Sequence, residues 1–277
     1  MIGHAAAAVR NAFLSPGFRR FGLSFARDYL RFAWRVARRW GDTGPGVVRW
    51  MGGDVRYTNR SSLTFLVHEI FVSCAYDFEP ARPDPLIVDC GGNIGVATLF
   101  FRRRFHAARV VVVEPHPEAF RLLEENTRAL ADGIQRIQAA VTEDGGPAVL
   151  IAPAADDASL MSTIDGGLEE VVGDATRTEV PGISLSALLA RLDEEVDFLK
   201  LDIEGAEYGA MRDCARTGAL ARVREVALEY HHTPSEPGGP ELLVQVLRES
   251  GFDEITVDEG ISGVDGVIRA RRTRSSG

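Results

Sequence analysis

Lysine is almost absent from this sequence. Of the 31 basic residues, 30 are arginine and one is lysine, Lys200, against 40 Asp and Glu residues. The net charge of −9 is unevenly distributed, because residues 1–60 carry 11 Arg and 3 Asp, whereas residues 61–277 carry 20 basic and 37 acidic residues. A general nucleic-acid binder usually presents a net basic domain with clustered Lys and Arg. We therefore expect no nucleic-acid partner for this acidic body.

Cysteine and long apolar runs are also scarce. The three cysteines stand far apart without a CxxC pair, which indicates neither a disulfide framework nor a zinc site. No apolar run approaches the ~20 residues that a membrane-spanning helix needs. The apolar stretch before Arg10 has five residues, too few for a signal peptide. We expect a cytoplasmic protein without a transmembrane segment.

Residues 1–60 differ from the rest of the chain. From Phe18 to Trp40, aromatic and apolar residues recur at spacings of three and four, which is typical of one face of a helix, and arginines fall mostly on another face. Glycine and proline between residues 41 and 46 end this pattern. The sequence predicts a basic amphipathic helical arm and linker over 1–60, and a separate domain over 61–277.

After Pro85, short β-branched runs alternate with helical stretches, a pattern typical of a mostly parallel sheet with helices on both faces. The expected strands are 86–88, 110–113, 134–141, 198–203 and 225–230. The expected helices are 94–105, 117–131, one capped by Ser184 or Ser186 that runs through 192, 207–215 and 241–249. Residues 254–257 and 266–270 predict a closing antiparallel pair, and segment 142–183 predicts a hairpin or lid. The sequence thus predicts a Rossmann-like α/β domain with about seven strands.

Two strand ends point to a nucleoside site, because ligands of such sheets bind beyond the carboxyl ends of the strands. The first expected strand runs into the glycine-rich turn 89–95, where a ligand can approach the backbone closely. Alone, this turn is equally well explained as a plain strand-to-helix connection. The second expected strand ends at Glu114, where a carboxylate can accept hydrogen bonds from a ribose diol.

The single lysine lies in a charged strand end. Lys200, Asp202 and Glu204 alternate with apolar residues, so that in a continuous strand all three side chains point to one side. We interpret Lys200 as an ion-paired support for Asp202, because a compact ammonium fits where a planar guanidinium fork does not. The alternative is a chance codon.

The next strand ends at Glu229 and His231, which also share a side. If the two strands are neighbours, Asp202, Glu229 and His231 converge on one rim of a cleft. Such a group can act as a general base for a hydroxyl or hold a divalent cation. For His231, a functional role and an ordinary structural one are equally well supported, and His232 is interpreted as a loop residue.

Four motifs together resemble the FkbM-type S-adenosylmethionine-dependent methyltransferases. They are VDCGGNIG at 88–95, VVVVEPHPEAFRLLEENT at 110–127, DFLKLDIEGAEYGAM at 197–211 and LEYHH at 228–232. The resemblance extends from about Glu69 to Ala270, and it leaves the arm and the 142–183 segment without a counterpart.

The resemblance implies S-adenosylmethionine as the cofactor and a class I methyltransferase fold. It implies that the cofactor lies against residues at three strand ends: Asp89, Gly91, Asn93, Gly95, Glu114 and Ala140. It further implies that the KxDxEGxE segment from Lys200 to Glu207 lies with its Asp202 end beside the transferable methyl group.

We expect transfer of that methyl to a hydroxyl of a small molecule, such as a natural product, sugar or glycolipid. Asp202 or His231 would accept the hydroxyl proton, and Glu229 would orient the acceptor or bind a cation. The alternative is a module that binds the cofactor without catalysis, as a partner in a biosynthetic assembly.

The arm has three interpretations. Such a stripe most often packs on its own domain or on the second copy of a homodimer while the arginines stay solvated, and we favour this interpretation. It could instead lie on an anionic membrane surface, where it would meet a lipid-linked acceptor. It could also hold an acidic carrier protein that presents a tethered acceptor.

Overall fold

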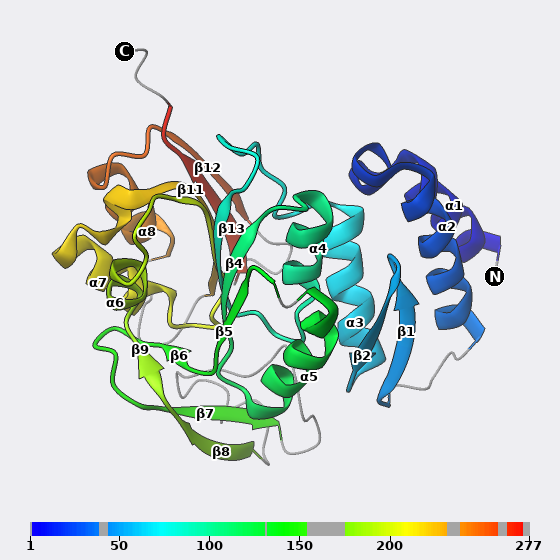
Figure 1. Ribbon diagram of the computed structural model, residues 1–277, viewed down its shortest axis with the longest axis horizontal. Coiled ribbons are helices and arrows are strands. Elements are labelled where there is room, and N and C mark those ends of the chain that lie inside the picture. The colour runs from blue at the N-terminus through cyan, green and yellow to red at the C-terminus, as the bar shows by residue number, and fades with distance from the viewer. Residues whose placement is uncertain are drawn as a thin grey trace.

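The computed structural model describes residues 2–38, 44–130, 132–153, 175–231, 239–259 and 265–273. A seven-stranded sheet with the order β12-β13-β11-β10-β3-β4-β5 forms its centre (Figure 1). The five strands β11, β10, β3, β4 and β5 pair in parallel, and β13 pairs antiparallel with both β11 and β12. This confirms the predicted Rossmann-like sheet with its closing antiparallel pair.

The sheet strands occupy short, apolar segments. Their bounds are β3 Leu86–Cys90, β4 Arg109–Val113, β5 Ile134–Ile137, β10 Val196–Leu201, β11 Val223–His231, β12 Glu254–Glu259 and β13 Asp265–Arg271. All residues of β3 and β10 are buried, as expected for central strands that are covered on both faces.

Helices cover both faces of this sheet. On one side lie α4 (Val96–Arg104) and α5 (Pro117–Thr127), and on the other lie α6 (Leu185–Ala190), α7 (Glu207–Thr217) and α8 (Glu241–Glu249) (Figure 1). Two large clusters of buried apolar side chains fill the two sides. Local signals set the helix starts: the Ser184 hydroxyl accepts from the Ala187 amide at 3.2 Å, and Pro117 occupies the first turn of α5.

Two predicted strands end earlier than expected. The strand predicted over 134–141 stops at Ile137, and β6 (Ala140–Val141) leaves the main sheet to pair with β9 (Gly182–Ile183). The strand predicted over 198–203 is β10, which ends at Leu201. Asp202 and Glu204 therefore lie in the turn beyond it, with Glu204 at φ 53°, and do not continue the alternation of the strand.

The 142–183 segment contains the predicted hairpin, formed by β7 (Ala148–Pro153) and β8 (Ala175–Val180) in antiparallel register. Residues 154–174 of this segment, like His232, lie outside the described residues. The predicted linker also has structure, because β1 (Gly46–Trp50) and β2 (Gly53–Tyr57) pair as a second hairpin. It leads into α3 (Arg60–Leu66) and the π-helical turn η1 (Val67–Val72).

The arm forms two helices, α1 (Ile2–Leu14) and α2 (Pro16–Arg38), with a kink at Gly22. Its aromatic stripe packs on the rest of the same chain, as we favoured. Phe25 and Phe32 lie 6.1 and 5.5 Å from the Trp50 ring, which in turn lies 5.3 Å from Phe71 of η1. The arm and the sheet domain therefore share one hydrophobic cluster. The domain boundary at residue 60 stays a prediction.

None of the helices in the described ranges combines the length and the apolar character that crossing a bilayer requires. The predicted cytoplasmic location stays a prediction.

The aromatic stripe makes the arm part of the folding unit. We expect Phe25→Ala to lower the free energy of unfolding by ~3–5 kcal/mol, because Phe25 is fully buried between Tyr29 and Trp50. Leu23→Ala on the same helix is the matched control, since Leu23 is 75% exposed and should change stability by less than about 0.5 kcal/mol. Urea denaturation measures both. Equal effects would show that the arm does not fold with the sheet domain.

Candidate active site

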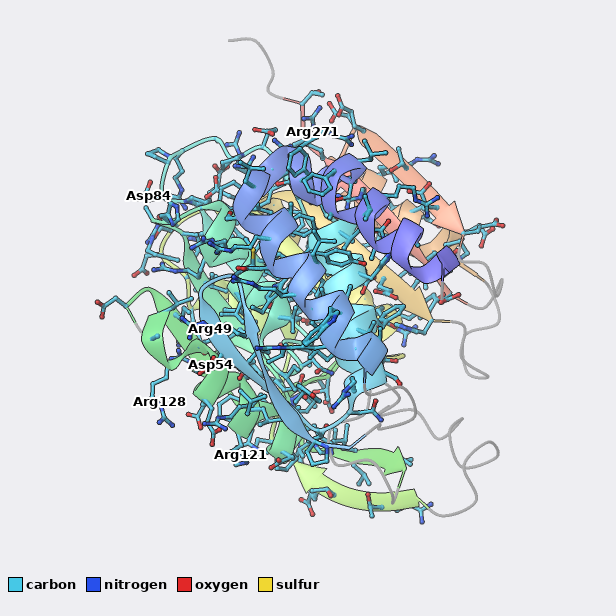
Figure 2. All side chains as sticks on the ribbon, turned by 90° about the vertical axis from the view of Figure 1, so that its right-hand side faces the viewer. Arg49, Asp54, Asp84, Arg121, Arg128 and Arg271 are labelled. Carbon is cyan, nitrogen blue, oxygen red and sulfur yellow. The ribbon has the colours of Figure 1, made fainter. Side chains whose placement is uncertain are left out.

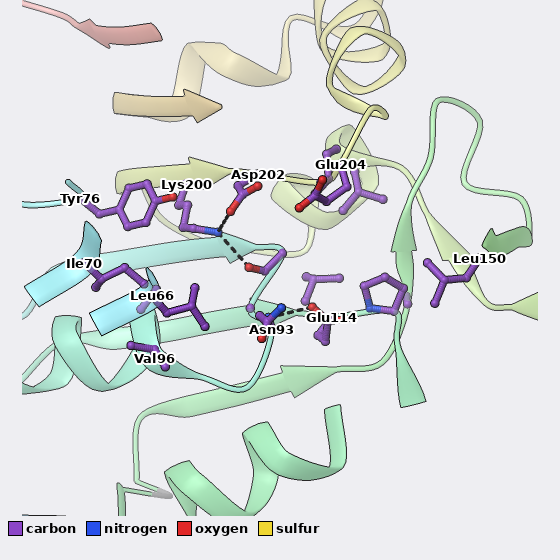
Figure 3. A pocket seen from close by; sticks show the side chains of 18 residues that line it. Leu66, Ile70, Tyr76, Asn93, Val96, Glu114, Leu150, Lys200, Asp202 and Glu204 are labelled. Carbon is purple, nitrogen blue, oxygen red and sulfur yellow. Dashed lines mark hydrogen bonds and ion pairs between the residues drawn. The ribbon is translucent and has the colours of Figure 1, made fainter. Parts of the chain in front are cut away.

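A cavity lies beyond the carboxyl ends of β3, β4 and β10 (Figure 3). The empty space in it, including a part that is open to solvent, is about 780 Å³. Leu66, Ile70, Val96 and Leu150 form apolar walls, and polar side chains gather around Lys200. Of the ten positions predicted to form the site, counting Lys200, the cavity wall contains Gly91, Asn93, Glu114, Lys200 and Asp202.

The glycine turn needs its glycines for backbone reasons. Gly91 has φ 83°, and a Cβ there would lie 1.7 Å from the carbonyl oxygen of Asp202. A Cβ on Gly92 would lie 2.2 Å from Val112 Cγ2. The amides of both glycines donate to the Val113 carbonyl at 3.0 Å, which holds the turn against β4. Close packing against β4 and against the turn after β10 therefore requires glycine at both positions.

Glu114 is held at the end of β4 by two backbone amides. Asn93 N and His116 N each donate to one of its carboxylate oxygens at 2.8 Å. Burial raises the pKa of Glu114 to about 7, although these hydrogen bonds act to lower it. Each oxygen can accept a further hydrogen bond, so the carboxylate can bind hydroxyl groups in the cavity.

Lys200 connects the glycine turn to Asp202. Its side chain is 3% exposed, with Nζ 3.1 Å from Asp202 Oδ2 and 3.5 Å from Asp89 Oδ1. It also donates to the Gly91 carbonyl at 2.8 Å. Burial acts to lower the pKa of Lys200, but the charges of Asp202 and Asp89 raise it above its usual value. This geometry confirms the predicted ion pair.

Three of the predicted cofactor residues lie behind the cavity wall. Asp89 is fully buried and accepts from the Thr98 hydroxyl at 3.0 Å. Gly95 has φ 89° and begins α4, packed against Leu123 and Thr127. Ala140 is fully buried in β6, although its neighbours Ala139 and Val141 do line the cavity.

Asp202, Glu229 and His231 converge as predicted, and of the three only Asp202 lines the cavity. β10 and β11 are parallel neighbours, and one ligand atom from each of the three side chains lies within 4.8 Å of the others. The Tyr76 hydroxyl donates to Glu229 Oε2 at 3.3 Å. Burial and the nearby charge of Asp202 raise the pKa of Glu229 to about 8.

His231 is tied to Glu207, to which we had assigned no role. Glu207 is fully buried, and Oε1 lies 3.1 Å from His231 Nδ1. The same carboxylate accepts a hydrogen bond from the Ile203 amide at 3.1 Å. It also accepts from the Gly205 amide, which lies 3.2 Å from Oε1 and 3.0 Å from Oε2, so it holds the turn that follows β10. In the sequence, the signal that could have identified Glu207 was its position as the last residue of the KxDxEGxE segment.

The charge state of His231 follows from these contacts. Burial acts to lower its pKa, but the hydrogen bond with Glu207 and the charges of Glu207 and Glu204 raise it to about 10. His231 Nε2 lies 3.6 Å from Glu204 Oε2. The imidazole is therefore protonated at neutral pH and is poorly suited to accept a proton there.

Glu69 and Tyr76 belong to the surroundings of the cleft but were not identified from the sequence. Glu69 lies in η1, where burial and the charge of Asp202 raise its pKa to about 7. Tyr76 lines the cavity, with its ring 5.2 Å from Lys200 Nζ. Both residues precede β3, outside any motif, and only the packing of η1 brings this segment to the sheet edge.

Comparison with known proteins adds independent information. The family model described as "Methyltransferase FkbM domain" matches residues 89–255. Methyltransferase 1 of Beauveria bassiana is 29% identical over 163 residues, which cover 53% of this chain and 66% of that protein. Methyltransferase sdnD of Sordaria araneosa is 29% identical over 238 residues, covering 75% and 89%.

A third relative is 31-O-demethyl-FK506 methyltransferase FkbM of Streptomyces tacrolimicus, which is 25% identical over 250 residues, covering 80% of this chain and 95% of that protein. The family match spans more than half of the sequence, from the start of the glycine turn through β10 and β11 into β12. The chain therefore belongs to the FkbM methyltransferase domain family and has the Rossmann-like fold of a class I methyltransferase.

Proposed function

We propose that this protein transfers a methyl group from S-adenosylmethionine to a hydroxyl group of a small molecule. The observation that carries the proposal is the Lys200 ion pair, which holds the Asp202 carboxylate at the cavity beside the glycine turn. The name of the Streptomyces relative, 31-O-demethyl-FK506 methyltransferase FkbM, supports oxygen as the acceptor atom. Natural products, sugars and glycolipids remain the acceptor classes we propose.

The residues fit this cofactor. The Glu114 carboxylate can accept hydrogen bonds from the ribose hydroxyls, and the turn at Gly91 and Asn93 leaves room for close approach of the rest of the ligand. The cofactor carries positive charge on its sulfonium and its ammonium group. Glu69, Asp202, Glu204 and Glu229 bring four carboxyl groups to the cleft, beside the cations Lys200 and His231. A cationic ligand favours the charged forms of these carboxyl groups, which burial disfavours at Glu69, Glu204 and Glu229.

The mechanism assigns different tasks to the cleft residues. Bound S-adenosylmethionine supplies a methyl group on a sulfonium, which is a good leaving group, so the protein mainly positions the acceptor and removes its proton. Asp202 accepts that proton, because His231 is already protonated and Asp202 faces the cavity. Glu229, held by the Tyr76 hydroxyl, orients the acceptor hydroxyl.

A divalent cation is a second candidate for the same rim. Two carboxylates and an imidazole are suitable donors, and those of Asp202, Glu229 and His231 are close enough to share one ion. His231 would have to release a proton to bind it, since Glu207 keeps the ring protonated. Dependence of the rate on Mg²⁺ after chelation would assign a cation here, whereas an unchanged rate would leave the three side chains acting alone.

Substitutions of Asp202 and of Glu114 should have different effects on turnover and on cofactor binding. We expect Asp202→Asn to lower kcat by ~10²–10⁴, with a much smaller change in the cofactor Kd. Glu114→Gln should instead raise the cofactor Kd, because one of its two oxygens becomes a donor. Calorimetry gives Kd, and mass spectrometry of the methylated product gives kcat. Equal losses of binding and turnover in Asp202→Asn would assign Asp202 to the cofactor site.

The same two measurements distinguish a methyltransferase from the alternative, a non-catalytic module that is a partner in a biosynthetic assembly. Such a module would bind the cofactor with both carboxylates intact, yet form no product with any hydroxylated acceptor.

The raised carboxyl pKa values predict a proton signature of binding. Glu69 and Glu114 have pKa values of about 7, and Glu204 and Glu229 of about 8, because burial disfavours their charged forms. A cationic ligand favours the charged forms and lowers these pKa values, so binding near pH 7 should release protons.

Calorimetry in buffers of different ionisation enthalpy measures that release. S-adenosylhomocysteine, which lacks the sulfonium charge, should release fewer protons than S-adenosylmethionine, and Glu229→Gln should reduce the difference. Equal release with both ligands, or proton uptake, would contradict a role for these carboxylates in cofactor binding.

A further inference from the structure

The outer face of α1 and α2 combines arginines with exposed apolar side chains. These two helices form the outermost layer on one side of the molecule, and Figure 2 looks onto that layer. The exposed apolar residues in them are Val9, Phe13, Leu14, Leu23 and Trp34. The exposed arginines, apart from Arg20, which pairs with Asp77 and Glu79, are Arg10, Arg19, Arg27, Arg31 and Arg35. We call this set the outer arm face.

The spacing of four residues of the outer arm face places them on one side of α2. Leu23, Arg27, Arg31 and Trp34 are separated by four, four and three residues, so they form one strip along the helix after the kink at Gly22. The strip lies opposite the buried residues such as Phe25 that contact the core. Leu23 and Trp34 are 75% and 58% exposed, so both side chains present apolar surface to solvent.

The layer formed by α1 and α2 carries almost only positive charge. Residues 2–38 contain seven arginines and one acidic residue, Asp28. Asp28 is buried and pairs with Arg27 at 2.9 Å and Arg31 at 3.8 Å, so no carboxylate among the described residues of α1 and α2 is exposed. Residues 61–277, by contrast, carry a net charge of −17 (20 basic and 37 acidic residues). A ligand of the outer arm face should therefore be anionic.

We propose that the outer arm face binds the surface of an anionic lipid bilayer. Phosphate groups complement the arginines, and the boundary between headgroups and acyl chains accommodates Leu23, Phe13 and Trp34. Nucleic acid would satisfy the arginines but would leave the aliphatic side chains exposed. Bilayer binding would bring the catalytic domain to a membrane surface, where lipid-linked acceptors are found.

Vesicle sedimentation tests this proposal without requiring methyl transfer, so it is independent of the proposed function. The full chain should sediment with vesicles of phosphatidylcholine and phosphatidylglycerol, bind much less to phosphatidylcholine alone, and dissociate partly as salt is raised. Arg19→Gln with Arg35→Gln should weaken binding roughly thirtyfold, equivalent to ~1 kcal/mol for each arginine near an anionic surface. Leu23→Ser with Trp34→Ser should also weaken it, and should do so at high salt as well.

The matched control is Arg191→Gln with Arg248→Gln, which removes the same charge from exposed positions beside α6 and in α8, on the other side of the sheet (Figure 1). This variant should bind like the wild type. All changes are at exposed positions, and thermal unfolding should show that each variant is folded. Two results would overturn the proposal: absence of binding to anionic vesicles, or loss of a homodimer or of binding to an acidic carrier protein in the arm variants while vesicle binding is unchanged.

Discussion

The burial of the Lys200 ammonium is the constraint on which the site depends. Removing an ion from water costs several kcal/mol unless opposite charges and hydrogen bonds compensate it. Here Asp89 and Asp202 provide the charges, and the Gly91 carbonyl accepts a hydrogen bond. Because these partners come from β3, from the glycine turn and from the turn after β10, one side chain sets the relative positions of three segments that border the cavity.

A second cation between two carboxylates repeats this arrangement at the neighbouring strand. His231 lies between the fully buried Glu207 and the partly exposed Glu204, as Lys200 lies between the fully buried Asp89 and the partly exposed Asp202. In each case the inner carboxylate anchors the cation and the outer carboxylate faces the cleft. The cations are thus held by the fold, and the outer carboxyl groups of Asp202 and Glu204 are left where a cationic cofactor would bind.

Much of this arrangement was predictable from the chain alone. The runs of β-branched residues predicted the order of strands and helices, and the single lysine beside Asp202 predicted the ion pair. The ends of the strands were less predictable, because apolar residues such as Ile203 continue beyond the last ladder hydrogen bonds of β10. Glu69 and Tyr76 gave no signal, since their role depends on how η1 packs against the sheet and not on any local pattern.

The amino-acid sequence by itself determined the succession of strands and helices along the chain and the glycine turn, because alternation and burial patterns are local. It predicted the convergence of Asp202, Glu229 and His231 on the condition that their strands are neighbours, and the structure meets that condition. Only the tertiary structure decided the charge states of the site residues and which side of the arm helices is buried. It shows that Glu207 keeps His231 protonated and that the aromatic side of the arm is buried, which leaves arginines, Leu23 and Trp34 outside. These properties depend on which distant groups come within a few ångströms, and no local sequence pattern specifies that.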